Sequence, residues 1–334
     1  MIDLSWHSLK LKNPYLFKGQ IRTEKTSAIL SFKTSKGDLK SELSVFPGLH
    51  DENKESYNLI IKDINWNNLK APSSPLLNLE ELCAFAKKYR SSNLSGNLLF
   101  ALDGLLLQFL GIHKKLPPKL QEIFKMKALK VKTALLVTDL ESSLPQSDRK
   151  LTYKVKVGRL SIQKEIKLLK KLFELNPYSQ FRLDANKHWN SREIKTLEKN
   201  LHRSEREKIQ YLEEPCESNL LNGTDLPVAW ETFNYPQLKN LKFIVIKPAV
   251  EKGIFEGLLK IQSLKMQNLT PILSSTFESS LGLRNIALMS LYTSRDYAHG
   301  LGTIAHIIPQ NLTETLATIS LDNGLIEFSG FHYE

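Results

Sequence analysis

The chain has 334 residues, of which 41% are hydrophobic and 24% are charged, with a formal net charge of +11. This composition is ordinary for a folded globular protein, suits one large α/β barrel or a barrel with a smaller companion, and excludes wholesale disorder. The two cysteines, Cys83 and Cys216, are too few for a disulfide framework or a four-thiolate zinc site. A reducing, cytoplasmic location is therefore expected.

Two sequence features argue against export and membrane insertion. The N-terminus lacks a charged start followed by an apolar core and a small-residue cleavage site, so we expect no signal peptide. The longest apolar stretch, residues 97–112, is interrupted by Asp103 and Gln108 and is too short to span a bilayer comfortably. We expect a buried helix there and no membrane partner.

The positive net charge raises the question of nucleic-acid binding. The densest basic run, residues 114–132, contains Pro117, Pro118 and one aromatic residue, and it matches no nucleic-acid-binding motif. A positive field that attracts a small anionic substrate is equally consistent with the charge. We therefore expect no nucleic-acid partner, and no feature of the sequence indicates an oligomeric state.

The first part of the chain predicts a small α+β unit over residues 1–125. Short β-like runs such as AILSFKT and SELSVFP alternate with turn residues up to about residue 67. Helical spacing of apolar residues follows at 79–89 and 98–110.

From about residue 131 the pattern changes to short apolar strands separated by helices or loops. The candidate strands are residues 131–137, 153–158, 181–186, 211–215, 228–232, 243–248, 271–276 and, more weakly, 298–303. The intervening helices are predicted at residues 161–175, 191–203, 251–265 and 278–292, the second of them with Asn190 and Glu193 as a capping box. Eight strands alternating with helices predict a (β/α) barrel over residues 126–310 rather than an open sheet. Residues 311–334 are expected to return to the N-terminal unit.

In such a barrel the chemistry lies at the carboxyl ends of the strands, and this chain has many polar residues there. They are Lys154, Lys156, Asp184, Asn186, Glu213, Glu231, Lys247, Ser274 and Ser275. The alternation of strand residues places Arg182, Asp184 and Asn186 on one face, which we expect to be the barrel interior.

The three acids favour a metal site. Asp184, Glu213 and Glu231 lie on successive strands and form an all-oxygen set that suits Mg²⁺ better than zinc. Salt bridges at the surface are the alternative for any one of them, but three strand-end acids flanked by lysines favour the metal. Lys156 or Lys247 is then a candidate base on a carbon acid, with Lys154 helping to lower the pKa of its neighbour.

Taken together, these motifs resemble the enolase superfamily and, within it, the o-succinylbenzoate synthase family. They are KVK at 154–156, RLDAN at 182–186, LEEP at 212–215, AWE at 229–231 and VIKP at 245–248. The string SSTFESSLGL at 274–283 is similar to the seventh-strand signature of this family, and SVFPG at 44–48 is similar to its capping-domain loop. The resemblance extends from about residue 40 to 305.

The resemblance implies a modified (β/α)7β barrel under an α+β capping domain, and it implies roles for individual residues. Asp184, Glu213 and Glu231 would hold Mg²⁺, with Mn²⁺ as a substitute, and Lys156 would be the acid/base group. Lys247 would stabilise the enediolate, and the pocket would be lined by Arg182, Asn186, Ser274, Ser275, Gly300 and Leu301. The implied reaction is the syn dehydration of 2-succinyl-6-hydroxy-2,4-cyclohexadiene-1-carboxylate, a substrate with two carboxylates, in menaquinone synthesis.

The chain departs from the family pattern at two positions. Glu231 stands where close relatives usually have Asp, and Gly302 stands where they often have Asp. The same site chemistry also fits an N-succinylamino acid racemase or a dipeptide epimerase, because Lys156 and Lys247 suit two-base racemisation. An alternative of another class is a non-catalytic barrel or a basic nucleic-acid binder, in which the acids and lysines are structural ion pairs.

Overall fold

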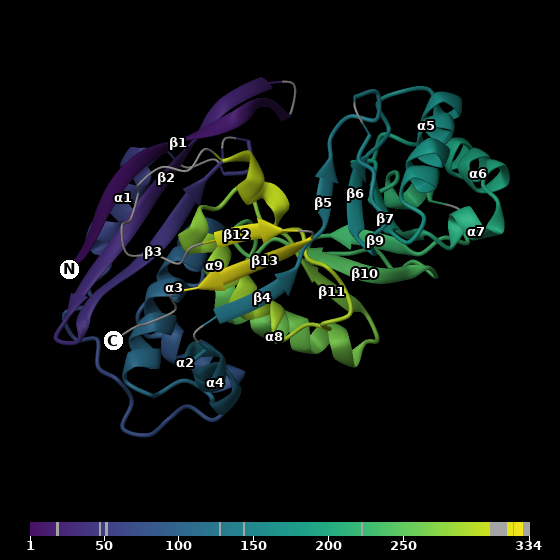
Figure 1. The fold of residues 1–334 in the computed structure, drawn as a ribbon. Helices are drawn as coiled ribbons and strands as arrows, with labels where there is room; N and C mark the ends of the chain where they lie inside the picture. Colours follow the sequence, from purple (N-terminus) through teal and green to yellow (C-terminus); the bar gives the residue numbers. More distant parts are fainter. Residues whose placement is uncertain are drawn as a thin grey trace.

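The computed structural model describes residues 1–17, 20–46, 48–50, 53–126, 128–142, 144–221, 223–307, 319–322 and 324–329. These residues form an N-terminal antiparallel sheet with its helices, a curled parallel sheet with helices on its outside, and a smaller antiparallel sheet (Figure 1). This arrangement confirms the predicted combination of a barrel-like α/β domain and an α+β cap.

The cap is built on a three-stranded antiparallel meander in the order β1-β2-β3. Its strands are β1 (Ile2–Phe17), β2 (Gln20–Thr34) and β3 (Gly37–Val45). Its helices are α1 (Lys54–Asp63), α2 (Leu79–Lys87), α3 (Gly96–Ile112) and α4 (Pro118–Phe124). Helix α3, the predicted buried helix, is buried at almost every residue because it packs on β3 on one side and on a barrel helix on the other.

The barrel strands form a curled, parallel seven-stranded sheet in the order β5-β6-β7-β8-β9-β10-β11. They are β5 (Leu135–Val137), β6 (Thr152–Lys156), β7 (Gln180–Asp184), β8 (Ile209–Glu213), β9 (Val228–Glu231), β10 (Leu241–Ile246) and β11 (Thr270–Leu273). The eighth predicted strand is reduced to two isolated bridges, His299 with Thr133 and Gly300 with Ser274. These bridges link the two edges of the sheet, next to β5 and β11.

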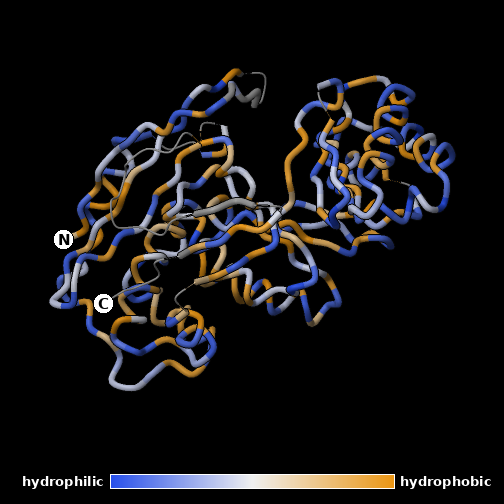
Figure 2. Tube along the Cα trace, viewed as in Figure 1, coloured by the Kyte–Doolittle hydropathy of each residue, from blue (hydrophilic) through white to orange (hydrophobic). Residues whose placement is uncertain are grey.

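Four of the barrel helices overlap the segments that the sequence periodicity predicts, and one short helix is additional. The four are α5 (Ile162–Leu175), α6 (Ser191–Asn200), α8 (Gly253–Met266) and α9 (Ser280–Ser290), and the additional helix is α7 (Arg203–Arg206). The predicted capping box is present, since the Asn190 side chain accepts from the backbone of Glu193 and the Glu193 side chain accepts from the backbone of Asn190. Hydrophilic and hydrophobic residues alternate along the turns of these helices (Figure 2), and the buried residues of α5 and α6 are mostly apolar.

The third sheet contains β4 (Ala128–Lys132), β12 (Ile319–Asp322) and β13 (Leu325–Ser329). The order is β12-β13-β4, with antiparallel pairing throughout. The described part of the C-terminal segment therefore pairs with the strand that opens the predicted barrel domain, whereas we expected it to return to the cap. Strand β4 buries Leu129 and Val131 and exposes its other residues, as a strand with one solvent-facing side does. Pairing with β13 satisfies the backbone of this strand.

Asp103, which interrupts the apolar run of α3, ties the cap to the barrel. Its carboxylate accepts from Nε of Arg90 at 2.5 Å and from the backbone N–H groups of Ile254 and Phe255 at 2.9 and 3.0 Å. Those two N–H groups belong to the first turn of α8, where a negative charge is favourable. The acid is thus explained by packing between α3 and α8.

Among the described helices, none is both long enough and apolar enough to cross a membrane.

Candidate active site

The carboxyl ends of the barrel strands bring the predicted residues into one layer. Lys156 on β6 is in register with Asp184 on β7, and Asp184 is in register with Glu213 on β8. Glu231 lies two residues beyond Ala229, the register partner of Glu213. Parallel pairing without a shift at these positions therefore sets Asp184 and Glu213 side by side, with Glu231 two residues farther along its strand.

The lysines of β6 are held by two of the acids. The ammonium nitrogen of Lys154 lies 2.8 Å from Oδ2 of Asp184 and 2.7 Å from Oε1 of Glu213. The ammonium nitrogen of Lys156 lies 2.7 Å from the same Asp184 oxygen and 2.8 Å from Oδ1 of Asn186. Two like charges on one strand face are tolerated because these buried carboxylates neutralise them.

The two lysines differ in their proton affinity. Burial lowers the pKa of Lys154, but the charges of Asp184 and Glu213 outweigh it, so the pKa of Lys154 is raised well above its ordinary value. Burial also lowers the pKa of Lys156, and although Asp184 opposes this, the positive charge of Lys154 helps to keep it below its ordinary value. Lys156 is therefore the easier of the two to deprotonate.

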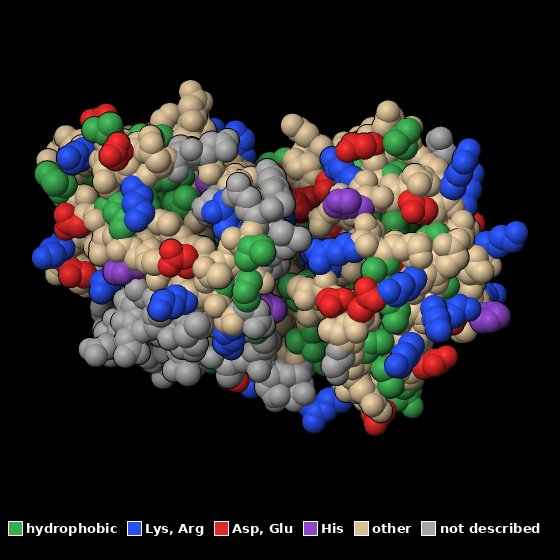
Figure 3. Space-filling model, turned by 90° about the horizontal axis from the view of Figure 1, so that it is seen from above, with side chains coloured by type: hydrophobic (Ala, Val, Ile, Leu, Met, Phe, Trp, Pro, Cys, Tyr) green, Lys and Arg blue, Asp and Glu red, His purple; other side chains and the backbone are tan. Residues whose placement is uncertain are grey.

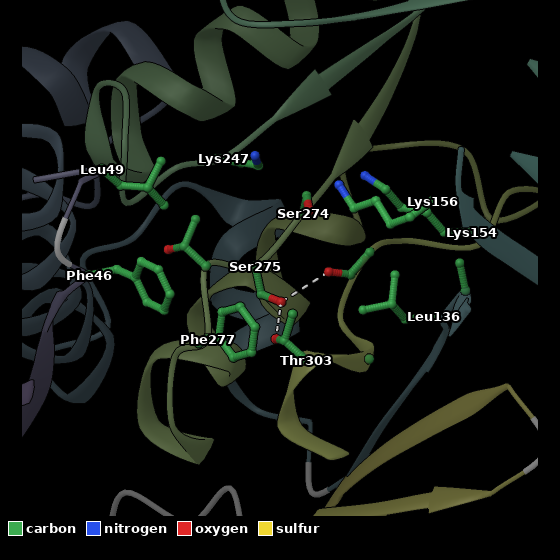
Figure 4. Close-up of a pocket in the computed structure, with 14 residues that line it drawn as sticks. Phe46, Leu49, Leu136, Lys154, Lys156, Lys247, Ser274, Ser275, Phe277 and Thr303 are labelled. Atoms are coloured by element: carbon green, nitrogen blue, oxygen red, sulfur yellow. Dashed lines mark hydrogen bonds between the residues drawn. The ribbon is translucent and has the colours of Figure 1, made fainter. Parts of the chain in front are cut away.

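A third lysine reaches the same pocket from a different strand of the sheet. Lys247 follows β10, and its ammonium nitrogen lies 2.6 Å from Oε1 of Glu231. Burial lowers the pKa of Lys247, but the charge of Glu231 outweighs burial and the net pKa is raised, so this lysine stays a cation. Figure 4 shows Lys154 and Lys156 side by side on one side of the pocket and Lys247 on another.

One carboxylate oxygen of the three strand-end acids is buried without a partner among the described residues. Within the described residues, Oε2 of Glu213 is buried and has no hydrogen-bond partner, and burial raises the pKa of Glu213 despite the nearby Lys154. A buried carboxylate oxygen without a donor is costly unless a cation binds there. Lys154 bridges Asp184 and Glu213, and no group of three His, Cys, Asp or Glu side chains in the described part of the chain is drawn together as a metal shell. The all-oxygen donor set nevertheless fits a hard divalent cation.

Two further acids surround this layer. Glu214 and Glu251 lie near Glu231, and burial together with that charge raises the pKa of each to about 7. Oε2 of Glu251 accepts from the backbone of Phe233 at 2.9 Å, whereas its Oε1 is buried without a partner among the described residues. Sequence reasoning missed both residues, although Glu214 lies in the quoted LEEP string.

The pocket in front of the lysines is lined by polar and apolar residues, and in Figure 4 Phe46, Leu49 and Phe277 lie on the side opposite Lys154 and Lys156. Ser274, Ser275 and Gly300 are among its lining residues, while their contact with substrate stays a prediction, and the Ser275 hydroxyl lies 2.5 Å from that of Thr303. Four apolar lining residues are ones that the sequence did not single out individually. They are Phe46, Leu49, Leu136 and Phe277.

Three predicted substrate-binding residues lie elsewhere. Arg182 is buried beneath the pocket, where it donates to Gln210 and to the carbonyl of Ala298 and lies over the Tyr211 ring. Leu301 is fully buried, and Asn186 contacts Lys156. Neither Leu301 nor Asn186 is among the lining residues, so for these three a direct contact with substrate stays a prediction.

The histidines near the barrel and Cys216 have local partners or are buried. His188 contacts the carbonyl of Ala185, and Cys216 is a buried free thiol. His299 accepts from the backbone of Leu273 through Nδ1 and lies 2.9 Å from Oγ1 of Thr293 through Nε2. It therefore orients the segment that links the edges of the barrel.

The surface charge is mixed on the side seen in Figure 3. Lys and Arg side chains are interspersed with Asp and Glu side chains over the visible described surface. The net charge of +11 is thus not gathered into one patch on that face.

Two curated sequence relatives are o-succinylbenzoate synthases. An o-succinylbenzoate synthase of Escherichia coli is 29% identical over 162 residues, which are 45% of this chain and 51% of that protein. An o-succinylbenzoate synthase of Haemophilus influenzae is 28% identical over 177 residues, which are 50% of this chain and 54% of that protein. The chain spans about half the length of the curated relatives it matches. No family model matches the chain.

Solved structures share the whole fold at low sequence identity. The L-Ala-D/L-Glu epimerase of Bacillus subtilis has a TM-score of 0.75 at 17% identity, covering 99% of this chain and 97% of that one. A dipeptide epimerase of Enterococcus faecalis, complexed with Mg and a dipeptide, has a TM-score of 0.74 at 16% identity, covering 99% and 98%. An N-succinyl Arg/Lys racemase of Bacillus cereus has a TM-score of 0.73 at 16% identity, covering 99% and 93%. These findings confirm the resemblance that the motifs indicated and establish the fold.

Proposed function

We propose that this chain is an o-succinylbenzoate synthase that dehydrates 2-succinyl-6-hydroxy-2,4-cyclohexadiene-1-carboxylate. The observation that carries the reaction class is the placement of Lys156 and Lys247 around one pocket, beside three strand-end carboxylates. The substrate is suggested by the sequence relatives, which carry the name o-succinylbenzoate synthase.

Lys156 is the proposed acid and base. As a neutral amine it accepts the proton on the carbon next to the carboxylate, and the electrons of that C–H bond enter an enediolate. The C–O bond of the neighbouring hydroxyl then breaks, the new C=C bond completes the aromatic ring, and the Lys156 ammonium returns its proton to form water. One group performs both transfers, so the two reacting bonds must lie on the same face.

The other site residues are proposed to stabilise the negative charge of the enediolate or to supply positive charge beside Lys156. Lys247, held as a cation by Glu231, offers an ammonium group to the enediolate. Asp184, Glu213 and Glu231 are the residues proposed to hold Mg²⁺, or Mn²⁺ in its place, which when bound supplies a Lewis acid for the negative charge. Lys154 keeps its proton and adds positive charge beside Lys156.

The pocket also supports a substrate with two carboxylates. Its cations suit the carboxylate at the reacting carbon, and the hydroxyls of Ser275 and Thr303 provide donors farther along the wall. Aromatisation of such a substrate belongs to menaquinone synthesis. The free, buried thiols of Cys83 and Cys216 are compatible with the proposed cytoplasmic location.

The direct test supplies the purified chain with the diene and Mg²⁺ and follows the absorbance of the aromatic product. Turnover above the uncatalysed rate is the expected result. An absence of turnover by metal-loaded protein would contradict the proposal, and it would favour the non-catalytic or nucleic-acid-binding alternative if Mg²⁺ also failed to bind.

A second candidate keeps the site and changes the substrate. Lys156 and Lys247 both line the pocket and enter it from different sides, which suits removal of a proton by one lysine and its return by the other (Figure 4). The fold neighbours include epimerases and a racemase. Exchange of the α-proton of an N-succinylamino acid or a dipeptide with deuterated solvent, read by NMR, separates this candidate from the first.

A further inference from the structure

A second buried charged cluster lies where the cap meets the barrel, outside the layer of strand-end acids. Lys25 on β2 and Glu42 on β3 form an ion pair of 3.3 Å, with side chains that are 0% and 1% exposed. Burying a charged pair is costly unless each partner is well hydrogen-bonded. The hydrogen bonds of Glu42 therefore determine whether the buried pair is compensated and which parts of the fold it links.

Glu42 links the cap to the N-terminus of α9. Its Oε1 accepts from Lys25 and, at 2.6 Å, from the Ser27 hydroxyl, both of them cap residues. Its Oε2 accepts from the backbone and hydroxyl of Ser279 at 2.8 and 2.7 Å and from the backbone of Gly282 at 3.1 Å. Ser279 is the N-cap of α9, so a cap carboxylate satisfies the first turn of a barrel helix.

Gly282 makes this approach sterically feasible. A Cβ atom at this position would lie 2.7 Å from Oε2 of Glu42 and 2.7 Å from Cβ of Glu278. Any larger residue would therefore push the cap strand and the helix apart.

The same cluster holds the loop between β11 and α9. Glu278 is buried, and its Oε2 accepts from the backbone of Thr276 at 2.5 Å. Lys25 faces this second carboxylate as well, and it also donates to the Ser44 hydroxyl at 2.7 Å. One cap lysine thus compensates two buried acids, one from the cap and one from the barrel.

This loop is a wall of the pocket. Ser275, Thr276 and Phe277 line the pocket, and Phe277 stacks on Phe46 of the cap with ring centroids 5.3 Å apart. Phe277 has a φ of 63°, a left-handed conformation that a non-glycine residue adopts only when its surroundings hold it. The next two residues after Phe277, Glu278 and Ser279, belong to the Glu42 cluster.

We propose that Glu42, together with Lys25, is a positioning residue that fixes the Ser275–Phe277 wall against the cap. The proposal rests on the proposed function only for its kinetic readout. Because the cluster contacts the wall and none of Lys154, Lys156 and Lys247, its loss should weaken substrate binding more than it slows the chemical step.

The test variant is Glu42→Gln, which keeps the shape but replaces one acceptor oxygen with an NH₂ donor. Whichever way the amide turns, donors from Lys25 and Ser27 or from Ser279 and Gly282 then face a donor. The matched control is Glu24→Gln, one residue before Lys25, whose exposed carboxylate accepts from the Ser8 hydroxyl at 2.6 Å.

Two measurements are made on each variant well below its unfolding temperature. Steady-state kinetics with the diene should show KM raised about tenfold and kcat changed by less than about threefold in Glu42→Gln. Amide hydrogen exchange should become about tenfold faster in residues 274–282 and stay unchanged at the C-terminal end of α9. Glu24→Gln should match the unmodified chain in both.

The outcomes separate the two proposals. A Glu42→Gln variant with a lower unfolding temperature but unchanged KM and unchanged exchange in residues 274–282 would overturn the positioning role. If the unmodified chain does not turn over the diene, the proposed function fails while hydrogen exchange still decides the role of Glu42.

Lys25→Met covers the case in which Glu42→Gln does not fold. It removes the cation and leaves the contacts of Glu42 to α9, so a smaller change in the same direction is expected. Unchanged KM and unchanged exchange in Lys25→Met would likewise contradict the proposal. In the double variant the two effects should be less than additive, because both changes act on one pair.

Discussion

The ammonium nitrogen of Lys156 lies 2.7 Å from Oδ2 of Asp184, its register partner on the next strand. Lys154 contacts the same oxygen at 2.8 Å, so the two lysines share one carboxylate. This sharing, together with burial, gives the lysines different proton affinities, with the pKa of Lys156 lowered and that of Lys154 raised. The geometry thus distinguishes a candidate base from a fixed cation.

Lys156→Ala should abolish turnover of the diene while the protein still folds. The side chain is the only group proposed to move the proton, and losses of about a thousandfold or more are typical when such a group is removed. Circular dichroism checks the fold and product absorbance checks the rate. Lys150→Ala, which removes an exposed lysine just before the same strand, should retain normal activity; appreciable activity in Lys156→Ala would assign the proton transfer to another residue.

Glu213→Gln should weaken the binding of Mg²⁺ at least about tenfold in calorimetric titrations. The change converts the carboxylate that has a buried, unpartnered oxygen into a neutral amide, and hard divalent cations favour charged oxygen ligands. Glu174→Gln, which neutralises an exposed carboxylate on α5, serves as the control and should bind as the unmodified chain does. Equal affinity in the two variants would place the metal elsewhere.

Asp103→Ala should lower the free energy of unfolding by about 3 kcal/mol, because it leaves Arg90 buried without its carboxylate and uncaps α8. Chemical denaturation measures the difference. Asp63→Ala removes an exposed acid at the end of α1 and should change stability by less than about 0.5 kcal/mol. Equal stability of both variants would show that the contact between α3 and α8 does not depend on this charge.

His299 should make the fold sensitive to acid. Burial lowers the pKa of His299 to about 3, with the charge of Arg182 adding to the effect, whereas an unfolded histidine has a pKa of about 6.5. Between these values the unfolded chain binds the extra proton, so this group's contribution to stability is complete above about pH 6.5 and falls as the pH drops toward 3. The expected slope is about 1.4 kcal/mol per pH unit.

The comparison variant for this prediction is His299→Asn, which keeps an acceptor for the backbone of Leu273 but does not titrate in this range. Its unfolding free energy is measured by denaturation between pH 4 and 7. The slope of this free energy against pH should be smaller by the contribution of one proton, about 1.4 kcal/mol per pH unit. Identical slopes would mean that His299 takes up its proton over the same pH range in the folded and unfolded states.

Much of the barrel could be predicted from sequence because local signals and the global fold agree there. The alternation around Val155 set the faces of β6, and the capping box at Asn190 marked the start of α6. The C-terminal pairing could not be predicted, because nothing near Leu325 specifies that β4 is its partner. The difference is one of range, since period and caps are local whereas strand partners depend on distant packing.

The candidate site shows the same division. Strand-end acids and lysines were found because their strands are parallel and in register. Leu49 and Phe277 were not singled out, because the wall depends on how the cap meets the barrel. The strand face predicted Arg182 in the barrel interior, where its guanidinium donates to the carbonyl of Ala298. Its contact with substrate, which the resemblance implies, stays a prediction.

The most direct test of the central claim compares two substrates on one Mg²⁺-loaded preparation. Two values of kcat/KM are measured, one for conversion of 2-succinyl-6-hydroxy-2,4-cyclohexadiene-1-carboxylate and one for solvent deuterium exchange at the α-carbon of an N-succinylamino acid. We expect the dehydration to be favoured by at least about a hundredfold. Faster exchange than dehydration, or exchange without dehydration, would contradict the assignment as an o-succinylbenzoate synthase.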